Sequence, residues 1–220
     1  VKGKLKNIVH GINNEIIDSK DNILGAASCT TNAIVPVLKV INDEFEIISG
    51  HIETVHAYTN DQNLIDNFHK KSRRGRSAAL NLVITETGAG SAVGQVLPEL
   101  EGKLTANSIR VPTPNVSLAI MKLNLKKSTD TTELNNFLRQ TAFHSKYKDQ
   151  IDFTNSNEIV SSDFVGNRYA GIIDSAATIC NENHAILYVW YDNEFGYTVQ
   201  LLGLAKDMVG LTYKRYPEYQ

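Results

Sequence analysis

The chain has 220 residues, of which 42% are hydrophobic and 21% charged, and its formal net charge is −2 at pH 7. This ordinary globular composition allows one or two domains with a sizeable core. The small net charge gives no support to nucleic-acid binding, and no apolar run approaches the roughly 20 residues of a membrane span. Its two cysteines indicate no disulfide framework, so a reducing, cytoplasmic compartment is expected.

The first half of the chain predicts a strand, a helix, a second strand and a long loop. A strand-like run at 22–27 leads into an apolar, helix-like run at 33–41. We expect Pro36 to make the first turn irregular or to move the regular helix later. Residues 46–58 are rich in Ile, Thr, Val and Tyr and predict a strand. A polar, basic loop follows at 59–77.

The second half continues the mixture of helices and strands. The predicted elements are helices at 89–100, 130–147 and 194–213 and strands at 116–125, 175–179 and 185–191. Asp130 is a capping candidate for the middle helix. The last two strands, joined by residues 180–184, predict an antiparallel hairpin. The pattern favours an α+β domain with a mainly antiparallel sheet.

The glycines at 88–94 do not form a dinucleotide fingerprint. Gly88 and Gly90 give G-x-G, but Gly94 comes one position late, and no parallel βαβ pattern precedes them. We therefore interpret the segment as a loop that leads into a helix. A doubly wound domain that could bind a dinucleotide is not complete in this sequence.

Cys29 lies in the segment Ser28-Cys29-Thr30-Thr31-Asn32, where the first strand-like run gives way to the helix-like run. A thiol at a helix start meets free backbone N–H groups and the positive end of the helix dipole. That environment lowers a thiol pKa and favours the nucleophilic thiolate. A single cysteine is more often a small buried residue, so a structural thiol remains the alternative at this point.

His56 lies 27 positions after Cys29, near the end of a predicted strand. It would take the proton of the thiol, or pair with the thiolate, and then act as acid or base on a substrate. A hydrogen-bonded core histidine is the alternative. His51 and His56 are an odd number of residues apart, so on a strand they face opposite sides and only one can easily reach Cys29. The same geometry argues against a metal site on this pair.

Several candidate phosphate ligands accompany these two residues. The basic loop contains Arg73-Arg74-Gly75-Arg76, although a charge run by itself indicates a solvated face. Thr87 and Gly88 lie at a predicted helix start, where hydroxyl and backbone N–H groups favour an anion. Arg110 opens a segment with two prolines, and its guanidinium binds phosphate through a rigid set of donors.

Six segments of the sequence resemble those of one known enzyme family. They are ASCTTN at 27–32, HAYTNDQ at 56–62, RRGR at 73–76, TGAGSAVGQVLPELEGKL at 87–104, RVPTPNVS at 110–117 and WYDNEFGY at 190–197. The chain closely resembles the phosphorylating glyceraldehyde-3-phosphate dehydrogenase family, which has these segments in the same order and at the same spacings.

The resemblance implies a reaction and a set of site residues. Cys29 would attack the aldehyde carbon of glyceraldehyde 3-phosphate, and His56 would activate Cys29 and, with the Cys29 backbone N–H, stabilise the hemiacetal oxygen. Hydride transfer to NAD or NADP would leave a thioester, which inorganic phosphate converts to 1,3-bisphosphoglycerate. The family's phosphate contacts correspond to Ser28, Thr30, Thr59, Asp61, Arg74, Thr87, Gly88 and Arg110. Asn193 matches the residue that fixes the nicotinamide carboxamide, and Tyr197 the residue beside that ring. Cys180 matches no catalytic position.

The resemblance also implies a domain organisation. Residues 1–28 correspond to the edge of a nucleotide-binding domain, 29–192 to the catalytic domain with helices on one face of its sheet, and 193–220 to a terminal helix that returns to the nucleotide-binding domain. We therefore expect a part of a larger, homotetrameric enzyme, with subunit contacts at 59–82. By itself this chain is expected neither to bind NAD tightly nor to turn over.

Three departures from the family pattern stand out. Asn67-Phe68 replace the Leu-Pro of NAD-specific glycolytic members, so NAD versus NADP stays open. Ala33 stands where many members have a second cysteine, and residues 213–220 do not resemble the usual ending. Three alternative functions also remain: oxidation of erythrose 4-phosphate, a non-catalytic oligomerisation or binding module, and a cysteine hydrolase. A scaffold would not need the combined set of Cys29, His56 and arginines, and a hydrolase would not need the phosphate ligands.

Overall fold

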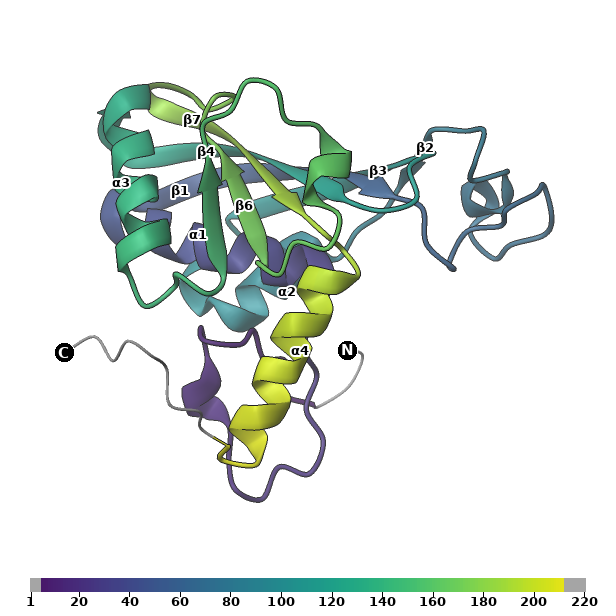
Figure 1. Cartoon of the computed structure of the whole chain (residues 1–220), viewed down its shortest axis with the longest axis horizontal. Coiled ribbons are helices and arrows are strands. Elements are labelled where there is room, and N and C mark those ends of the chain that lie inside the picture. The colour runs from purple at the N-terminus through teal and green to yellow at the C-terminus, as the bar shows by residue number, and fades with distance from the viewer. Residues whose placement is uncertain (1–4, 212–220) are drawn as a thin grey trace.

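The computed structural model describes residues 5–211, and within them seven strands form one mixed sheet in the order β2-β3-β1-β4-β7-β6-β5 (Figure 1). The strands are β1 (Ile47–Ala57), β2 (Val83–Thr85), β3 (Leu104–Val111), β4 (Ser117–Asp130), β5 (Ile151–Thr154), β6 (Gly171–Asp174) and β7 (Ile179–Tyr191). The helices are α1 (Cys29–Phe45), α2 (Ala89–Val96), α3 (Thr131–His144) and α4 (Phe195–Met208), with 3-10 turns η1 (Asn14–Ile16), η2 (Ser72–Gly75), η3 (Pro98–Leu100) and η4 (Ser161–Phe164). The pairs β1/β3 and β5/β6 are parallel and the other pairs are antiparallel, which confirms the predicted α+β class.

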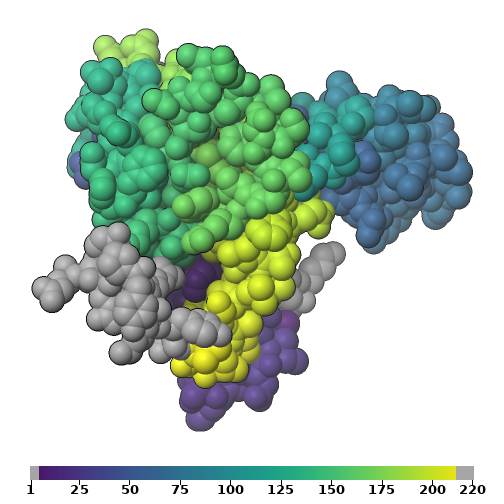
Figure 2. Space-filling view, viewed as in Figure 1, coloured from purple at the N-terminus to yellow at the C-terminus, as the bar shows by residue number. Residues whose placement is uncertain are grey.

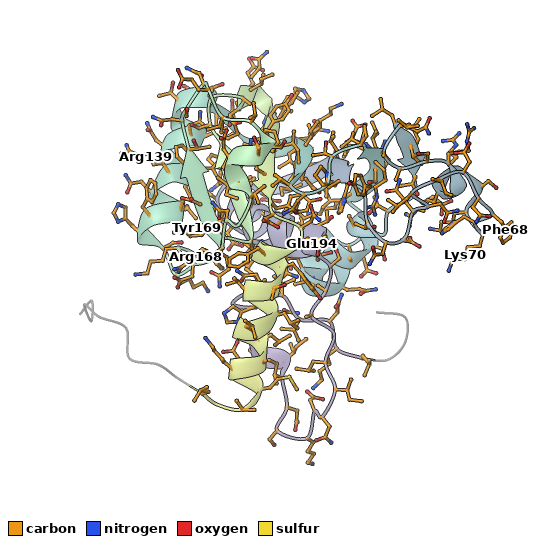
Figure 3. All side chains as sticks on the ribbon, turned by 45° about the vertical axis from the view of Figure 1, so that its right-hand side comes forward. Phe68, Lys70, Arg139, Arg168, Tyr169 and Glu194 are labelled. Atoms are coloured by element: carbon orange, nitrogen blue, oxygen red, sulfur yellow. The ribbon has the colours of Figure 1, made fainter. Side chains whose placement is uncertain are left out.

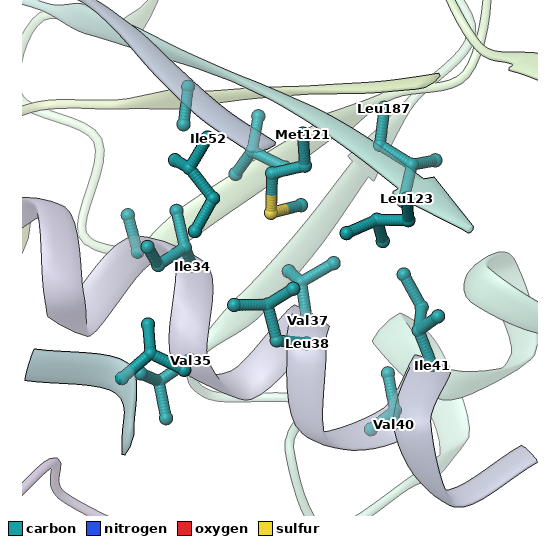
Figure 4. Packing of buried hydrophobic residues seen from close by; sticks show 14 of the residues in the cluster. Ile34, Val35, Val37, Leu38, Val40, Ile41, Ile52, Met121, Leu123 and Leu187 are labelled. Carbon is teal, nitrogen blue, oxygen red and sulfur yellow. The ribbon is translucent and has the colours of Figure 1, made fainter. Parts of the chain in front are cut away.

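The core lies between the sheet and helices α1, α2 and α3, which cover one face of it. Side chains alternate between the two faces of a strand, and between residues 117 and 125 of β4 the odd-numbered residues are buried and the even-numbered ones are not. Figure 4 shows Leu38 and Ile41 of α1 below Met121 and Leu123 of the sheet. Each such side chain contributes about 1.5–3 kcal/mol on burial, so the contact fixes α1 against the strands.

Helix α1 begins earlier than its sequence predicts. It starts at Cys29, directly after the cap residue Ser28, and Pro36 lies inside it. The expectation that Pro36 would displace the regular helix was therefore wrong. A proline removes one backbone hydrogen bond, but Pro36 and its neighbours on both sides are buried in the core. The packing energy offsets that loss and keeps the helix continuous.

The prediction of an antiparallel hairpin at 175–191 is also wrong. Residues 175–178 form the turn, β6 precedes them at Gly171–Asp174, and β7 is one continuous strand over Ile179–Tyr191. The polar residues 180–184 suggested a turn because they carry no apolar pattern. In the fold they extend β7 beyond the core, where Asn181 pairs with Asp130 and His184 with Asn124 at a register shift. The backbones of Asn181, Glu182 and His184 are paired with β4 while their side chains meet solvent, and the half-buried Cys180 packs against the core.

Most of the remaining predictions hold with shifted ends, and one does not. β1 confirms the strand at 46–58, and β4 is longer than predicted. Asp130 caps α3 by accepting a hydrogen bond from the backbone N–H of Glu133 at 2.8 Å. The helix at 89–100 divides into α2 and η3 at Pro98, and α4 ends at Met208, while Tyr213 lies outside the described residues. The run at 22–27 forms no strand and makes only a parallel bridge, from Gly25 to Asn7.

Residues 59–82 form an arm that stands away from the body of the molecule (Figure 2). Its exposed apolar residues are Leu64, Ile65, Phe68, Leu80 and Leu82. At the opposite end, α4 lies alongside the N-terminal segment, with His10 Nδ1 2.7 Å from Asp207 Oδ2 (Figure 1). No helix of the described residues is long and apolar enough to cross a lipid bilayer.

Candidate active site

Cys29 is placed by a tightly hydrogen-bonded turn at the start of α1. The Ser28 side chain accepts from the backbone N–H of Thr31 at 3.1 Å, and Asn32 Nδ2 donates to the carbonyl groups of Ala26 and Ser28. Ala27 has a φ of +57°, which lets the chain reverse directly before the helix. The segment that carries the nucleophile candidate is therefore also the helix cap. It leaves the thiol at the first residue of α1.

The side chain of His56, on β1, contacts that of Cys29, at the start of α1. The Cys29 Sγ and His56 Nε2 atoms are 3.6 Å apart, although the residues are 27 positions apart in sequence. His56 is buried, with 5% of its surface exposed. His51 lies on the other face of β1, where it bonds Thr105 and Asn107 of β3. The prediction that only one of the two histidines reaches the thiol is confirmed.

The hydrogen bonds of His56 define which of its nitrogens can accept a proton. Nδ1 lies 2.7 Å from the Ala57 carbonyl oxygen. A carbonyl oxygen only accepts, so in the tautomer that satisfies this contact Nδ1 carries the proton and Nε2 has a free lone pair. Arg110 Nη1 lies 3.0 Å from Nδ1 and donates to the same oxygen at 3.0 Å. Arg110 only donates and so competes for Nδ1, but it also satisfies the Ala57 oxygen; in the Nδ1–H tautomer, Nε2 faces the Cys29 thiol as a proton acceptor.

The pKa values of His56 and Cys29 are both shifted towards the neutral forms of the two side chains. Burial, and then the positive charge of Arg110, lowers the pKa of His56 to about 4. Burial raises the pKa of the half-buried Cys29 thiol, although the Thr30 backbone and hydroxyl and the Arg110 charge act in the opposite direction. The prediction that the helix start lowers the thiol pKa is wrong for this state, because desolvation outweighs the helix and hydroxyl contributions. The site holds a thiol and an imidazole that can exchange a proton.

Arg110 and Arg74 bring two guanidinium groups to the same place. Arg110 pairs with His56 in the β1/β3 register, and its Nη1 also donates to Thr59 Oγ1 at 3.2 Å. Arg74 belongs to η2, and its Nε donates to Thr85 Oγ1 at 2.9 Å. Arg74 also forms an ion pair with Asp61. Both arginines are thereby fixed through residues of the arm and of the strands next to it.

A cavity of about 630 Å³ joins these groups. The predicted site residues that line it are Ser28, Cys29, Thr30, His56, Arg74, Thr87, Gly88 and Arg110. Gly88 caps α2, and the Thr87 hydroxyl accepts from the backbone N–H of Ala89 at 3.3 Å. The other two predicted phosphate ligands, Thr59 and Asp61, line a neighbouring cavity of about 830 Å³ and reach the first one through Arg110 and Arg74.

Asn193 lies two residues before α4, and Tyr197 lies in the first turn of that helix. Asn193 is buried, its Oδ1 accepts from Ser117 Oγ at 2.9 Å, and its Nδ2 donates to Glu194 Oε1 at 3.2 Å. Burial raises the pKa of Tyr197, and a negative charge on Cys29 acts in the same direction. Among the described residues, no cluster of three His, Cys, Asp or Glu side chains could hold a metal ion.

Comparison with known proteins matches residues 28–193 to the model described as "Glyceraldehyde 3-phosphate dehydrogenase, C-terminal domain". The chain belongs to this family. A glyceraldehyde-3-phosphate dehydrogenase-like protein of Pseudomonas aeruginosa is 63% identical over 216 residues, which are 98% of this chain and 47% of that protein. A glyceraldehyde-3-phosphate dehydrogenase of Borreliella burgdorferi is 44% identical over 210 residues, 94% of this chain and 62% of the relative. The chain thus spans about half the length of the curated relatives it matches.

Sequence reasoning missed two residues of this glyceraldehyde 3-phosphate dehydrogenase domain. Tyr191 is fully buried, and its hydroxyl lies 2.9 Å from Thr30 Oγ1, next to the nucleophile candidate. Ser117 accepts from the backbone N–H of Ala57 at 3.1 Å and donates to Asn193. Both residues fall inside segments that resemble the family. No local pattern showed that their hydroxyl groups connect α1, β1 and the start of α4.

Proposed function

We propose that this chain is the catalytic part of an oxidoreductase that oxidises glyceraldehyde 3-phosphate with a nicotinamide dinucleotide and inorganic phosphate to 1,3-bisphosphoglycerate. The observation that carries the proposal is the Cys29–His56 contact of 3.6 Å in a cavity that also holds Arg74 and Arg110. A nucleophile and base suit attack on a carbonyl carbon, and two guanidinium groups suit a phosphorylated substrate. Membership of the family supports the same reaction.

Cys29 and His56 carry out the first step. As Sγ bonds to the aldehyde carbon, Nε2 of His56 takes the thiol proton, which gives a thiohemiacetal oxyanion beside an imidazolium. The neutral resting pair suits this transfer, because the proton moves only when the carbon–sulfur bond forms. The Cys29 backbone N–H, at the first residue of α1, has no acceptor within the helix and can donate to the hemiacetal oxygen together with His56.

Asn193 and Tyr197 fit the nicotinamide of NAD or NADP. One of the two Nδ2 protons of Asn193 donates to Glu194 within the described residues, which leaves the other for a carboxamide oxygen. A nicotinamide held by Asn193 and Tyr197 would supply the acceptor for the hydride of the carbon bonded to Cys29 Sγ. Cys29 then holds an acyl group as a thioester. Asn67 and Phe68 give no preference between NAD and NADP, so the proposal covers both.

Inorganic phosphate completes the reaction at Cys29. A phosphate oxygen attacks the thioester carbon, the carbon–sulfur bond breaks, and the sulfur regains a proton from His56. Arg74, Arg110 and the hydroxyls of Thr30 and Thr87 line the cavity where the two phosphate groups of the product would lie. Charge-assisted hydrogen bonds from guanidinium to phosphate are among the strongest in proteins, so these side chains are expected to hold both groups.

The proposal includes assembly and location. We propose a homotetramer whose subunits meet at the arm, which is supported by the exposed Leu64, Ile65 and Phe68. The two free cysteines suit a cytoplasmic enzyme. The 220-residue polypeptide alone is expected to show no turnover, because Asn193 and Tyr197 are the cofactor ligands that we assign among its described residues. Calorimetric titration with NAD would contradict this expectation if it gave a micromolar dissociation constant.

The test uses the full-length protein that contains this chain. It should reduce NAD or NADP with glyceraldehyde 3-phosphate only when inorganic phosphate is present, and should use erythrose 4-phosphate with poorer acyl transfer. Cys29→Ser should lose at least about a thousandfold in kcat, because the thioester cannot form. Cys180→Ser, a change in the chain's other cysteine, should retain activity. Phosphate-independent turnover, or an active Cys29→Ser variant, would show that the proposed reaction is wrong.

A further inference from the structure

We propose that Lys71 is an additional phosphate-binding residue of the cavity at Cys29, where it recruits the inorganic phosphate that attacks the thioester. This inference rests on the function proposed above and deepens it. Lys71 lines the same cavity as Cys29, Arg74 and Arg110. It is one of three cations there, and Glu86 is the one carboxylate among the lining residues.

The backbone of the arm directs Lys71 to this cavity. Lys71 is the cap residue of η2, and its carbonyl accepts from the backbone N–H of Arg74 at 2.8 Å. The backbone N–H of Lys71 donates to His69 Nδ1 at 2.9 Å. These two bonds hold the Lys71 main chain in a fixed relation to Arg74. By contrast, Lys70 lies at the outer part of the arm, near Phe68, as Figure 3 shows.

The other two cations, Arg74 and Arg110, already bind groups of the protein. A third cation can therefore contribute to phosphate binding. Arg74 is paired with Asp61, so part of its charge is neutralised. Arg110 donates to the Ala57 carbonyl and to Thr59. The product of the proposed reaction carries two phosphate groups, and each is a dianion near neutral pH. Two arginines, one of them paired with a carboxylate, do not balance that charge.

The Lys71 ammonium is well suited to exchange partners. It is half exposed, and its partner Glu86 lies 3.9 Å away with 93% of its side chain in solvent. Such exposed pairs contribute little free energy, so a phosphate dianion can replace the carboxylate. A lysine carries a compact charge on a flexible stem, with three donors that can rotate. Lys71 at the cavity wall can therefore meet free phosphate before the fixed arginines do.

The experiment compares Lys71→Met with Lys70→Met, a change of the adjacent lysine outside the cavity. The measured quantity is the rate at which iodoacetamide alkylates Cys29, followed separately from that of the other free cysteine, Cys180, and inorganic phosphate should slow it. Lys71→Met should raise the phosphate concentration that gives half protection by about fivefold at low salt, the factor for an ion pair at the upper end of the exposed range. Lys70→Met should leave it unchanged, and Lys71→Arg should retain most of the protection. Molar salt should remove the difference.

The same variants in the full-length enzyme separate this inference from the proposed function. Lys71→Met should raise KM for phosphate by a similar factor with little change in kcat. Equal protection in Lys71→Met and the unchanged chain, an equal effect of Lys70→Met, or no protection by phosphate at all would each overturn the role of Lys71. A fivefold loss of protection in an enzyme without dehydrogenase activity would support the phosphate site and refute the dehydrogenase.

Discussion

The buried His56 should make the stability of this protein fall between neutral and mildly acidic pH. Its pKa is about 4 in the folded protein, against an ordinary value of 6.5. As the pH falls below 6.5, His56 becomes protonated in the unfolded chain but stays neutral in the folded chain. Protonation of His56 therefore favours unfolding. The full stabilisation is present above 6.5 and lost as the pH falls towards 4. The difference between the two pKa values corresponds to about 3 kcal/mol in the free energy of unfolding. Of this, about 2 kcal/mol is lost between about pH 7 and pH 5.

The assay is urea unfolding followed by the fluorescence of Trp190, the one tryptophan of the sequence. His56→Gln removes the titrating group, so the loss between these pH values should shrink by about 2 kcal/mol. His51→Gln, on the opposite face of the same strand, should retain the pH dependence of the unchanged protein. The reasoning is refuted if His56→Gln and the unchanged protein lose the same free energy, or if His51→Gln abolishes the loss.

Two further changes test how the site is supported. Ser117→Ala removes the acceptor of the Ala57 N–H and the donor to Asn193, both in buried surroundings; it should lower the free energy of unfolding by about 1–3 kcal/mol, and an unchanged urea midpoint would contradict this. Gly171→Ala would place a Cβ 2.6 Å from the Ala33 carbonyl oxygen and 2.8 Å from a Val189 methyl group. It should destabilise the junction of β6 and α1 by about 1–3 kcal/mol, whereas an unaltered melting temperature would show that the backbone yields freely there.

Local sequence patterns correctly predicted the elements whose own residues favour that type of secondary structure. β1 was predicted because its residues favour strands, and α3 because Asp130 is a good cap. The error at 175–191 has the opposite origin. Residues 180–184 carry no apolar pattern, and β4 alone provides the backbone partners that make them part of β7. β3 was not predicted as a strand, and its parallel pairing with β1 joins residues about 54 positions apart.

The sequence by itself predicted which residues carry the proposed chemistry: Cys29 in its segment, His56 at a strand end, and the arginines of the arm and of β3. It also determined, through the period of a strand, that His56 and His51 face opposite sides. The tertiary structure alone decided that Sγ and Nε2 lie 3.6 Å apart and that one cavity joins them to Arg74 and Arg110. It also decided their protonation, because burial raises the thiol pKa and lowers the imidazole pKa. Desolvation depends on what packs around a group, and that packing is assembled from segments far apart in the chain.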